Sequence, residues 1–313
     1  MPLISVIIPA YKAEKYLGHT LDSLRTQSFP DFECLIVDDG SPDQSAAVAQ
    51  SFVSQDPRFK LLRQTNAGVA AARNNGFAAA SPDSSFITFM DADDAYLPHA
   101  FHTLLTALRD HPDMIGAHGL ADMIDPHSQP FSPGTFPAFQ RARTGFDGRS
   151  LIPWGTDKPT TFQTLVHHSR IYPPGLLLYR RPFVQATLPF DASLSPVEDW
   201  DFLIRISRHG PIAFLNTILL HYRRHPEQAT TAALKRIYAA TARMHKKTFA
   251  SPDNTPEQKA IVKGAFRAWQ RMKIREKWSA IKPSVTAGRF DRTAKLLAHM
   301  TAHAALFAKG SPV

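Results

Sequence analysis

Short apolar runs and longer amphipathic segments alternate along the first hundred residues of this chain. Four runs have the length of buried strands and lie at residues 4–8, 32–37, 59–62 and 85–90. Three segments with helical spacing separate them, at residues 13–26, 43–54 and 66–80. In the first of these, Leu17, Leu21 and Leu24 fall on one face of a helix. The alternation predicts an α/β fold with a mixed, mostly parallel sheet flanked by helices.

The pattern is less regular in the second part of the chain. Further elements are predicted at residues 98–109 (helix), 114–118 (strand), 198–206 (helix) and 212–222 (two short strands), and a regular pattern also returns at residues 175–181. A stretch rich in Pro, Gly and Ser reaches to about residue 161 and fits a long loop. Residues from about 229 onward fit helices. We therefore predict an α/β domain over residues 1–230 and a basic helical C-terminal extension over residues 231–313.

Composition indicates a folded protein without disulfides. Apolar residues make up 43% of the chain, which is enough for a core, and the single cysteine, Cys34, lies within an apolar run. A buried thiol is therefore expected, and no internal disulfide can form. The apolar N-terminus is short and has no basic segment before it, unlike a signal peptide or a membrane span. These features predict a cytoplasmic protein.

The positive charge is concentrated in the extension. Residues 1–234 hold 19 Lys and Arg against 23 Asp and Glu, whereas residues 235–313 hold 17 against 4. Aromatic and other apolar residues alternate with basic ones in the extension, at Phe266, Trp269, Met272, Ile274 and Trp278. Such a helix can lie on an anionic membrane, as a peripheral contact at the inner face of the cell membrane, or pack on the α/β domain with a solvated basic face. No motif indicates nucleic-acid binding.

Polar residues follow three of the predicted strands. The carboxyl ends of neighbouring parallel strands meet at one rim, where functional residues gather. Here those ends carry residues 9–11, 38–41 and 91–94. Carboxylates clustered behind a buried strand favour a divalent cation with a diphosphate, because such charges are costly to fold unpaired. The alternative is a solvated turn whose Asp residues cap the helix that begins near residue 98.

Several motifs in order give the chain a family resemblance. The motifs lie at residues 6–11, 23–29, 35–41, 66–76 and 91–94. In this order they resemble the family 2 glycosyltransferases of the GT-A type, which have a Rossmann-like α/β fold and transfer a sugar from a nucleotide-sugar donor. Later segments at residues 196–201 and 221–230 resemble the acidic motif and the Tyr-Arg-x-His stretch of the same family.

The resemblance implies roles for individual residues. Residues that would contact the donor are Pro9, Tyr11, Asp39, Arg73, Asp91 and Asp93. Residues that would meet a Mn²⁺ or Mg²⁺ ion are Asp93, Asp94 and His225, with Asp93 or Asp94 as the direct ligand. The residue types suit these roles, since hard cations prefer oxygen ligands and a guanidinium pairs with a diphosphate or with the carboxylates.

Each of these assignments has a simpler structural alternative. Asp39 can contact a base or a ribose, or Asp38 or Asp39 can merely cap the helix after residue 42. Tyr11 can pack on the nucleoside or only cover the rim of the sheet. Arg73 can serve the diphosphate or form an ordinary surface ion pair. His225 can be a ligand or a solvent-facing side chain.

Asp199 is the residue that the resemblance identifies as the catalytic base. A carboxylate within hydrogen-bonding reach can remove the proton of an acceptor hydroxyl while the new bond forms. One base on the face opposite the leaving group gives single displacement with inversion at the anomeric carbon. The alternative for Asp199 is a carboxylate that only interacts with a helix dipole.

The predicted function is that of an inverting, metal-dependent hexosyltransferase-type enzyme. The resemblance favours a UDP-sugar donor, and the acceptor would be a hydroxyl of a glycan or lipid-linked molecule in cell-surface polysaccharide synthesis. A nucleotidyltransferase would need a glycine-rich loop after the first strand, which residues 9–14 lack. The remaining alternative is a catalytically inactive sugar-nucleotide-binding or scaffold protein, which would have little reason to keep Asp93, Asp94 and Asp199 together.

Overall fold

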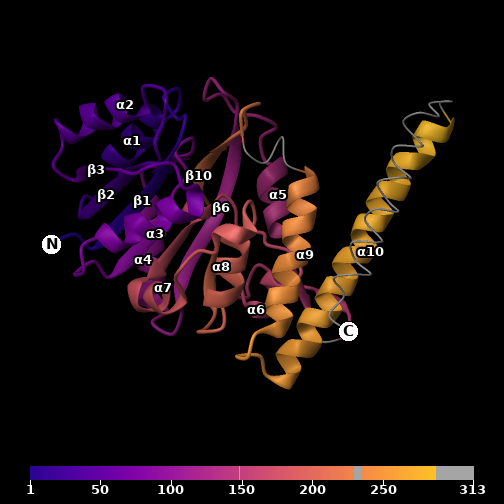
Figure 1. The fold of residues 1–313 in the computed structure, drawn as a ribbon. Coiled ribbons are helices and arrows are strands. Elements are labelled where there is room, and N and C mark those ends of the chain that lie inside the picture. The colour runs from indigo at the N-terminus through magenta and orange to yellow at the C-terminus, as the bar shows by residue number, and fades with distance from the viewer. Residues whose placement is uncertain (148, 229–233, 287–313) are drawn as a thin grey trace.

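The computed structural model describes residues 1–147, 149–228 and 234–286, with side chains in the last helix described as far as Arg271. A large sheet stands at the centre with helices around it, and two long helices lie beside each other at one flank (Figure 1). The α/β architecture predicted from the sequence is confirmed.

The central sheet has eight strands in the order β3-β2-β1-β4-β9-β6-β10-β5. Their bounds are β1 Ile4–Ala10, β2 Phe32–Asp38, β3 Phe59–Arg63, β4 Phe86–Phe89, β5 Ala95–Tyr96, β6 Gly116–Ile124, β9 Leu177–Arg180 and β10 Ile212–Arg223. Strands β7 Thr144–Phe146 and β8 Leu151–Pro153 form a separate antiparallel pair. Strands β1 to β4, β6 and β10 run in one direction, and only β9 and β5 oppose them. The carboxyl ends of the parallel strands therefore share one rim.

Helices connect and cover these strands. Their bounds are α1 Leu17–Arg25, α2 Ser45–Val53, α3 Val69–Ala79, α4 Ala100–Asp110, α5 Thr135–Arg141, α6 Phe162–Leu165, α7 Arg181–Thr187, α8 Glu198–Ile206, α9 Leu234–Ala250 and α10 Pro256–Thr286. Two short 3₁₀ turns, η1 Pro174–Leu176 and η2 Ala192–Leu194, precede β9 and α8.

Close packing of α3 on the sheet fixes the position of the residues that this helix carries. A Cβ on Gly76 would lie 2.4 Å from the Cγ2 atom of Ile7 on β1 and 3.0 Å from Val37 on β2. Only glycine lets the helix backbone approach the two strands so closely. Arg73, one turn earlier on the same helix, is thereby held at the rim of the sheet.

Two local predictions are wrong. Residues 212–222 form the single strand β10 rather than two strands, and it pairs with β6 along its length with register shifts between Phe214 and Leu220. The polar residues 216–217 thus lie in an irregular part of one strand and do not separate two strands. The stretch expected to be a loop contains α5, β7 and β8, whose short lengths gave no clear periodicity.

The described part of the extension packs on the rest of the chain. Phe266 and Trp269 of α10 are 1% and 3% exposed and lie against Trp200 of α8 and Tyr238 of α9. These two aromatic rings are therefore part of the interior, as the packed alternative requires. The side chains of Met272, Ile274 and Trp278 lie outside the described residues. Within the described ranges, we find no helix with the length and apolar character of a membrane span.

Candidate active site

The ends of β1 and β2 form one side of the rim. Pro9 is half-buried within β1, and Tyr11, just beyond the strand, is 47% exposed. Asp38 ends β2 and is buried, where its carboxylate accepts a hydrogen bond from the main-chain N–H of Ser41 at 3.1 Å. Tyr11 thus presents an exposed aromatic ring at the rim, and its contact with a nucleoside stays a prediction.

Asp39 is engaged by the loop that leads into α3. Its carboxylate accepts hydrogen bonds from the Gln64 side chain at 2.7 Å, from the Ala67 N–H at 2.8 Å and from the Gly68 N–H at 2.9 Å. A carboxylate has about four accepting positions, so these contacts leave one. The N-cap residue of α2 is Gln44 and no side chain caps this helix, so Asp39 does not cap it, and its contact with a base or ribose stays a prediction.

Three carboxylates gather behind β4. Ligand oxygens of Asp91, Asp93 and Asp94 all lie within 4.8 Å of one another. One oxygen of the fully buried Asp94 accepts from the main-chain N–H of Arg223 at 3.1 Å, and the other has no hydrogen-bond partner among the described residues. Burial raises the pKa of Asp94 well above its ordinary value, and the charges of Asp93 and Asp91 raise it further. A cation would relieve both effects.

The cluster does not cap the following helix. Helix α4 begins at Ala100, its N-cap residue is His99, and no side chain caps it. The short strand β5 lies between the carboxylates and this helix. The alternative in which the acidic residues form a capping turn is therefore wrong.

His225 approaches the cluster from the end of β10. Its Nε2 atom lies 2.9 Å from an oxygen of Asp93, and its Nδ1 atom lies 3.0 Å from Glu227. Glu227 in turn pairs with Lys15 at 3.1 Å. Burial lowers the pKa of His225, but the hydrogen bonds with Asp93 and Glu227 outweigh it, so the pKa lies above its ordinary value. His225 is thus a partner of Asp93, and its direct ligation of a metal stays a prediction.

Arg73 links the cluster to a second group of acids. The guanidinium is 3% exposed, with one nitrogen 2.9 Å from Asp91 and another 2.9 Å from Glu198 at the start of α8. It is a buried bridge between Asp91 and Glu198, and the latter lies 125 positions from Arg73 in the chain. The surface ion-pair alternative for Arg73 is therefore wrong.

Asp199 follows Glu198 in the first turn of α8. One of its oxygens accepts from the Trp200 N–H at 2.7 Å, and its side chain borders a pocket lined by the aromatic rings of Phe89, Tyr179, Phe190 and Phe202. Burial, followed by the charge of Glu198, raises the pKa of Asp199 to about 7. A carboxyl with this pKa can exchange a proton near neutral pH. Through Glu198 and Arg73 the acid is joined to the carboxylate cluster.

The family follows from the sequence match. Residues 5–185, more than half of the chain, match the family described as glycosyl transferase family 2. The chain belongs to glycosyltransferase family 2.

Relatives of this glycosyltransferase include polysaccharide enzymes. Over 242 residues it is 31% identical to the uncharacterized glycosyltransferase EpsJ of Bacillus subtilis. The matched segment covers 75% of this chain and 65% of EpsJ. Over 235 residues it is 25% identical to the chondroitin synthase of Escherichia coli. This match covers 75% of this chain and 31% of the synthase. The chain spans less than two thirds of the length of either relative.

Solved structures share the fold of this glycosyltransferase. The mannosyltransferase PcManGT of Pyrobaculum calidifontis, in complex with GDP-Man and Mn²⁺, matches with a TM-score of 0.65 at 16% identity over 98% of this chain and 85% of that one. S. aureus TarS in complex with UDP-GlcNAc matches with a TM-score of 0.63 at 18% identity over 86% of this chain and 71% of that one. At such identities the likeness concerns the fold, which is of the GT-A type.

The acidic cluster of this glycosyltransferase fits a hard divalent cation. Three carboxylates supply oxygen ligands within a few ångströms, and the unpartnered buried oxygen of Asp94 is oriented for a further interaction. Mg²⁺ and Mn²⁺ favour oxygen ligands and keep positions for phosphate and water. The donor set is therefore suitable for either ion.

Two functional positions were missed by the sequence analysis. Arg223 is 1% exposed and supports the cluster by donating to the main-chain oxygens of Asp93, at 2.9 Å, and Asp125, at 3.0 Å. Glu198 anchors Arg73. Arg223 lies inside the segment that resembles the Tyr-Arg-x-His stretch. An arginine at the end of an apolar strand was the signal that could have identified it. Glu198 gave no signal that separated it from its acidic neighbours.

Proposed function

We propose that this chain is an inverting glycosyltransferase that moves a hexosyl group from a nucleoside-diphosphate sugar to a hydroxyl of a glycan or lipid-linked acceptor. One observation carries the proposal. The contacts from Asp91 through Arg73 to Glu198 join a cation-suited carboxylate cluster to Asp199, the acid whose pKa is raised to about 7. Donor activation and proton removal need such a pair of sites side by side.

The donor would lie along the rim formed by β1, β2 and β4. Pro9, Tyr11 and Asp39, at the ends of β1 and β2, would contact the nucleoside, and Arg73 and Asp91, which pair with each other, the diphosphate side. Asp93 and Asp94 would hold a Mn²⁺ or Mg²⁺ ion, with His225 oriented on Asp93. When bound, this ion supplies Lewis-acid neutralisation of the departing nucleoside diphosphate.

Asp199 would remove the proton of the acceptor hydroxyl. Its ordinary pKa of 3.8 is raised to about 7, which makes it a stronger base than an exposed aspartate while leaving it largely ionised at mildly basic pH. Attack on the face opposite the leaving group inverts the anomeric centre. The apolar rings around Asp199 keep water from competing for that proton.

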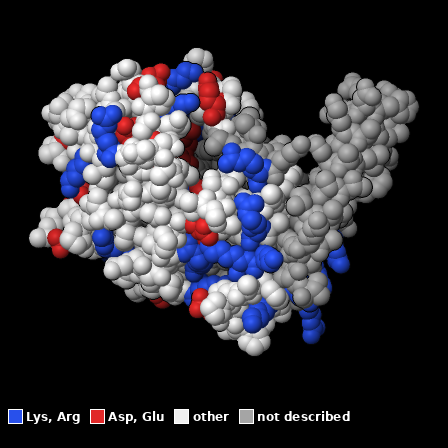
Figure 2. Space-filling model, viewed as in Figure 1, with Lys and Arg blue, Asp and Glu red and all other residues white. Residues whose placement is uncertain are grey.

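We propose a UDP-sugar as the donor and a growing cell-surface polysaccharide or lipid-linked glycan as the acceptor. A solved complex of TarS with UDP-GlcNAc and the similarity to chondroitin synthase support this choice, and PcManGT with GDP-Man is the competing precedent. The site of action would be the cytoplasmic side of the cell membrane. Basic side chains gathered over α8 and α9 (Figure 2) would face anionic lipid headgroups there.

A thermal-shift screen tests the donor assignment. UDP-, GDP- and dTDP-sugars are added with and without Mn²⁺, because a ligand of the native state raises its melting temperature. We expect a metal-dependent rise with UDP-sugars, and transfer to acceptor glycans with that donor. A rise with transfer absent would favour the inactive sugar-nucleotide-binding protein, and no rise with any donor would overturn the proposal.

A further inference from the structure

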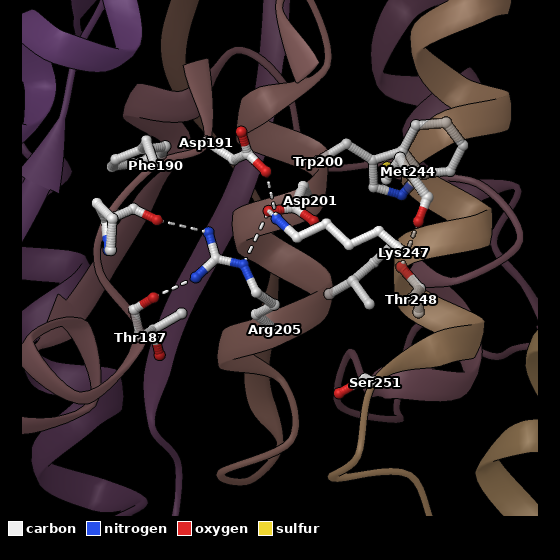
Figure 3. A network of polar contacts seen from close by, with 12 residues as sticks. Thr187, Phe190, Asp191, Trp200, Asp201, Arg205, Met244, Lys247, Thr248 and Ser251 are labelled. Atoms are coloured by element: carbon white, nitrogen blue, oxygen red, sulfur yellow. Dashed lines mark hydrogen bonds and ion pairs between the residues drawn. The ribbon is translucent and has the colours of Figure 1, made fainter. Parts of the chain in front are cut away.

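Helix α8, which carries Asp199, is held from two sides. On one side Glu198 pairs with the buried Arg73. On the other side Asp201 pairs with Lys247 of α9, a helix of the C-terminal extension (Figure 3). Asp199 lies between these two anchored acids and has no ion pair among the described residues. The position of the base on α8 therefore depends on contacts that it does not make itself.

The Asp201 carboxylate is the centre of the second anchor. Its side chain is 2% exposed, and one of its oxygens lies 2.8 Å from Nε of Arg205 and 3.0 Å from Nζ of Lys247. Lys247 is 40% exposed and also reaches Asp191 at 2.7 Å (Figure 3). One ammonium group thus joins α9 to α8 and to the segment before η2.

The same anchor extends to a wall of the pocket at Asp199. Arg205 donates to the main-chain oxygens of Thr187 and Pro189, in the segment that leads to Phe190 (Figure 3). The ring of Phe190 stacks on Phe202 with centroids 4.3 Å apart, and both rings border the pocket. Holding Asp201, Arg205 and this segment in register therefore fixes both the base and the apolar surface beside it.

We propose that Lys247 is a positioning residue for the transfer reaction, which makes α9 part of the catalytic unit. This inference rests on the proposed function of Asp199 as the base. Lys247 itself touches no substrate. It fixes the angle of the first turn of α8, so that the Asp199 carboxylate meets the acceptor hydroxyl at hydrogen-bonding distance.

Positioning of this kind acts on the chemical step more than on donor binding. A general base must lie within about 3 Å of the proton it removes, and a displacement of about 1 Å can lower the rate by about 100-fold. The donor side of the site is built from β1, β2, β4 and α3, which Lys247 does not contact. Loss of Lys247 is therefore expected to lower kcat without weakening donor binding.

Three variants test the inference in the full-length protein. Lys247→Met removes the ammonium but keeps the length of the side chain, and Asp201 retains Arg205, so the fold should persist. Lys247→Arg restores a donor to both carboxylates. Lys246→Met, at the exposed neighbouring position on α9, is the matched control because Lys246 makes no ion pair within the described residues. Kinetic constants, donor binding by calorimetry and hydrogen exchange of residues 198–206 are compared.

The expected result is a selective loss. In Lys247→Met, kcat falls at least tenfold, donor affinity stays within twofold, and amides of α8 exchange at least tenfold faster. Lys247→Arg recovers most of kcat, and Lys246→Met equals the wild type. Unchanged kcat and exchange in Lys247→Met would overturn the inference, as would a parallel loss of donor affinity that arginine does not rescue.

The exchange measurement separates this inference from the proposed function. If the wild type transfers no sugar from any donor, the proposed function fails, and with it the catalytic meaning of the anchor. If the wild type is active and α8 of Lys247→Met exchanges at the wild-type rate, only the inference fails.

Discussion

The two acidic regions of the site differ in how their charges are balanced. On α8, Glu198 pairs with Arg73 and Asp201 pairs with Arg205 and Lys247, whereas Asp199 between them has no ion pair among the described residues. Behind β4 the carboxylates lie close together: Asp91 shares Arg73 with Glu198, Asp93 pairs with His225, and among the described residues the buried Asp94 accepts only from a main-chain N–H.

The difference indicates two kinds of chemistry. An isolated carboxyl with a raised pKa is suited to accept a proton. A group of carboxylates with too few protein cations is suited to hold a metal ion. Local charge compensation, and not the number of acidic residues, thus distinguishes the proposed base from the proposed ligands.

The largest expected effect follows from removing the lone acid. Asp199→Asn keeps the shape of the side chain but cannot accept a proton, so kcat should fall by about 10² to 10⁴. Donor affinity, measured by calorimetry, should stay within a few fold because the role proposed for Asp199 concerns the acceptor. Transfer at the wild-type rate by this variant would remove Asp199 from the role of base.

Neutralising one carboxylate of the cluster should weaken metal-dependent donor binding and should not affect proton transfer. Asp94→Asn keeps an oxygen for the Arg223 N–H but removes a buried charge, so we expect donor binding with Mn²⁺ to weaken about 10- to 100-fold. Without metal the same variant should melt at a higher temperature than the wild type, since burial and neighbouring charges disfavour the ionised Asp94. A lower melting temperature without metal would contradict this account of the cluster.

The pH dependence of transfer should report the lone acid. Asp199 must be deprotonated to act as a base, and its pKa is raised to about 7 by burial and then by the charge of Glu198. The value of kcat/KM is therefore expected to fall tenfold per pH unit below about 7 and to level off above it. A profile that is flat between pH 5 and about 8 would contradict the raised pKa.

The smallest expected effect concerns the anchor of α8. Hydrogen bonds from Lys247 and then Ser193 lower the pKa of Asp191 from 3.8 to about 2. A depressed folded pKa stabilises the fold above the unfolded value, and this contribution is lost as the pH falls through about 2. Asp191→Asn should therefore lower the free energy of unfolding at pH 6 and have little effect near pH 2. Urea unfolding of the wild type and the variant at several pH values measures the difference between their free energies of unfolding. A difference that stays constant with pH would contradict this account.

The sequence predicted the donor side of the site more completely than its other contacts. Strands β1, β2 and β4 were identified because short β-branched runs have few alternatives, and the acids that follow them must reach the shared rim. Arg73 was selected from its motif, but its partner Glu198 lies 125 positions away, a distance that no local pattern spans.

Contacts between helices were also beyond local pattern. The basic and aromatic alternation in α10 fits both a membrane surface and a packed helix, and only the position of Trp200 and Tyr238 decides where Phe266 and Trp269 lie. The anchor between Lys247 and Asp201 likewise depends on how α9 crosses α8. Residue type alone does not encode that crossing.

The direction of strand β9 determines which residues should be substituted to change the acceptor. Because β9 runs antiparallel to β4 and β6, its N-terminal end, and not its C-terminal end, lies at the rim where the carboxyl ends of the parallel strands meet. Ile171 and Pro174, just before it, border the pocket at Asp199, whereas Arg180 at its far end holds main-chain oxygens of Leu108 and Met114. Libraries aimed at new acceptors therefore belong in the segment leading into β9, whereas substitution of Arg180 would disturb the scaffold.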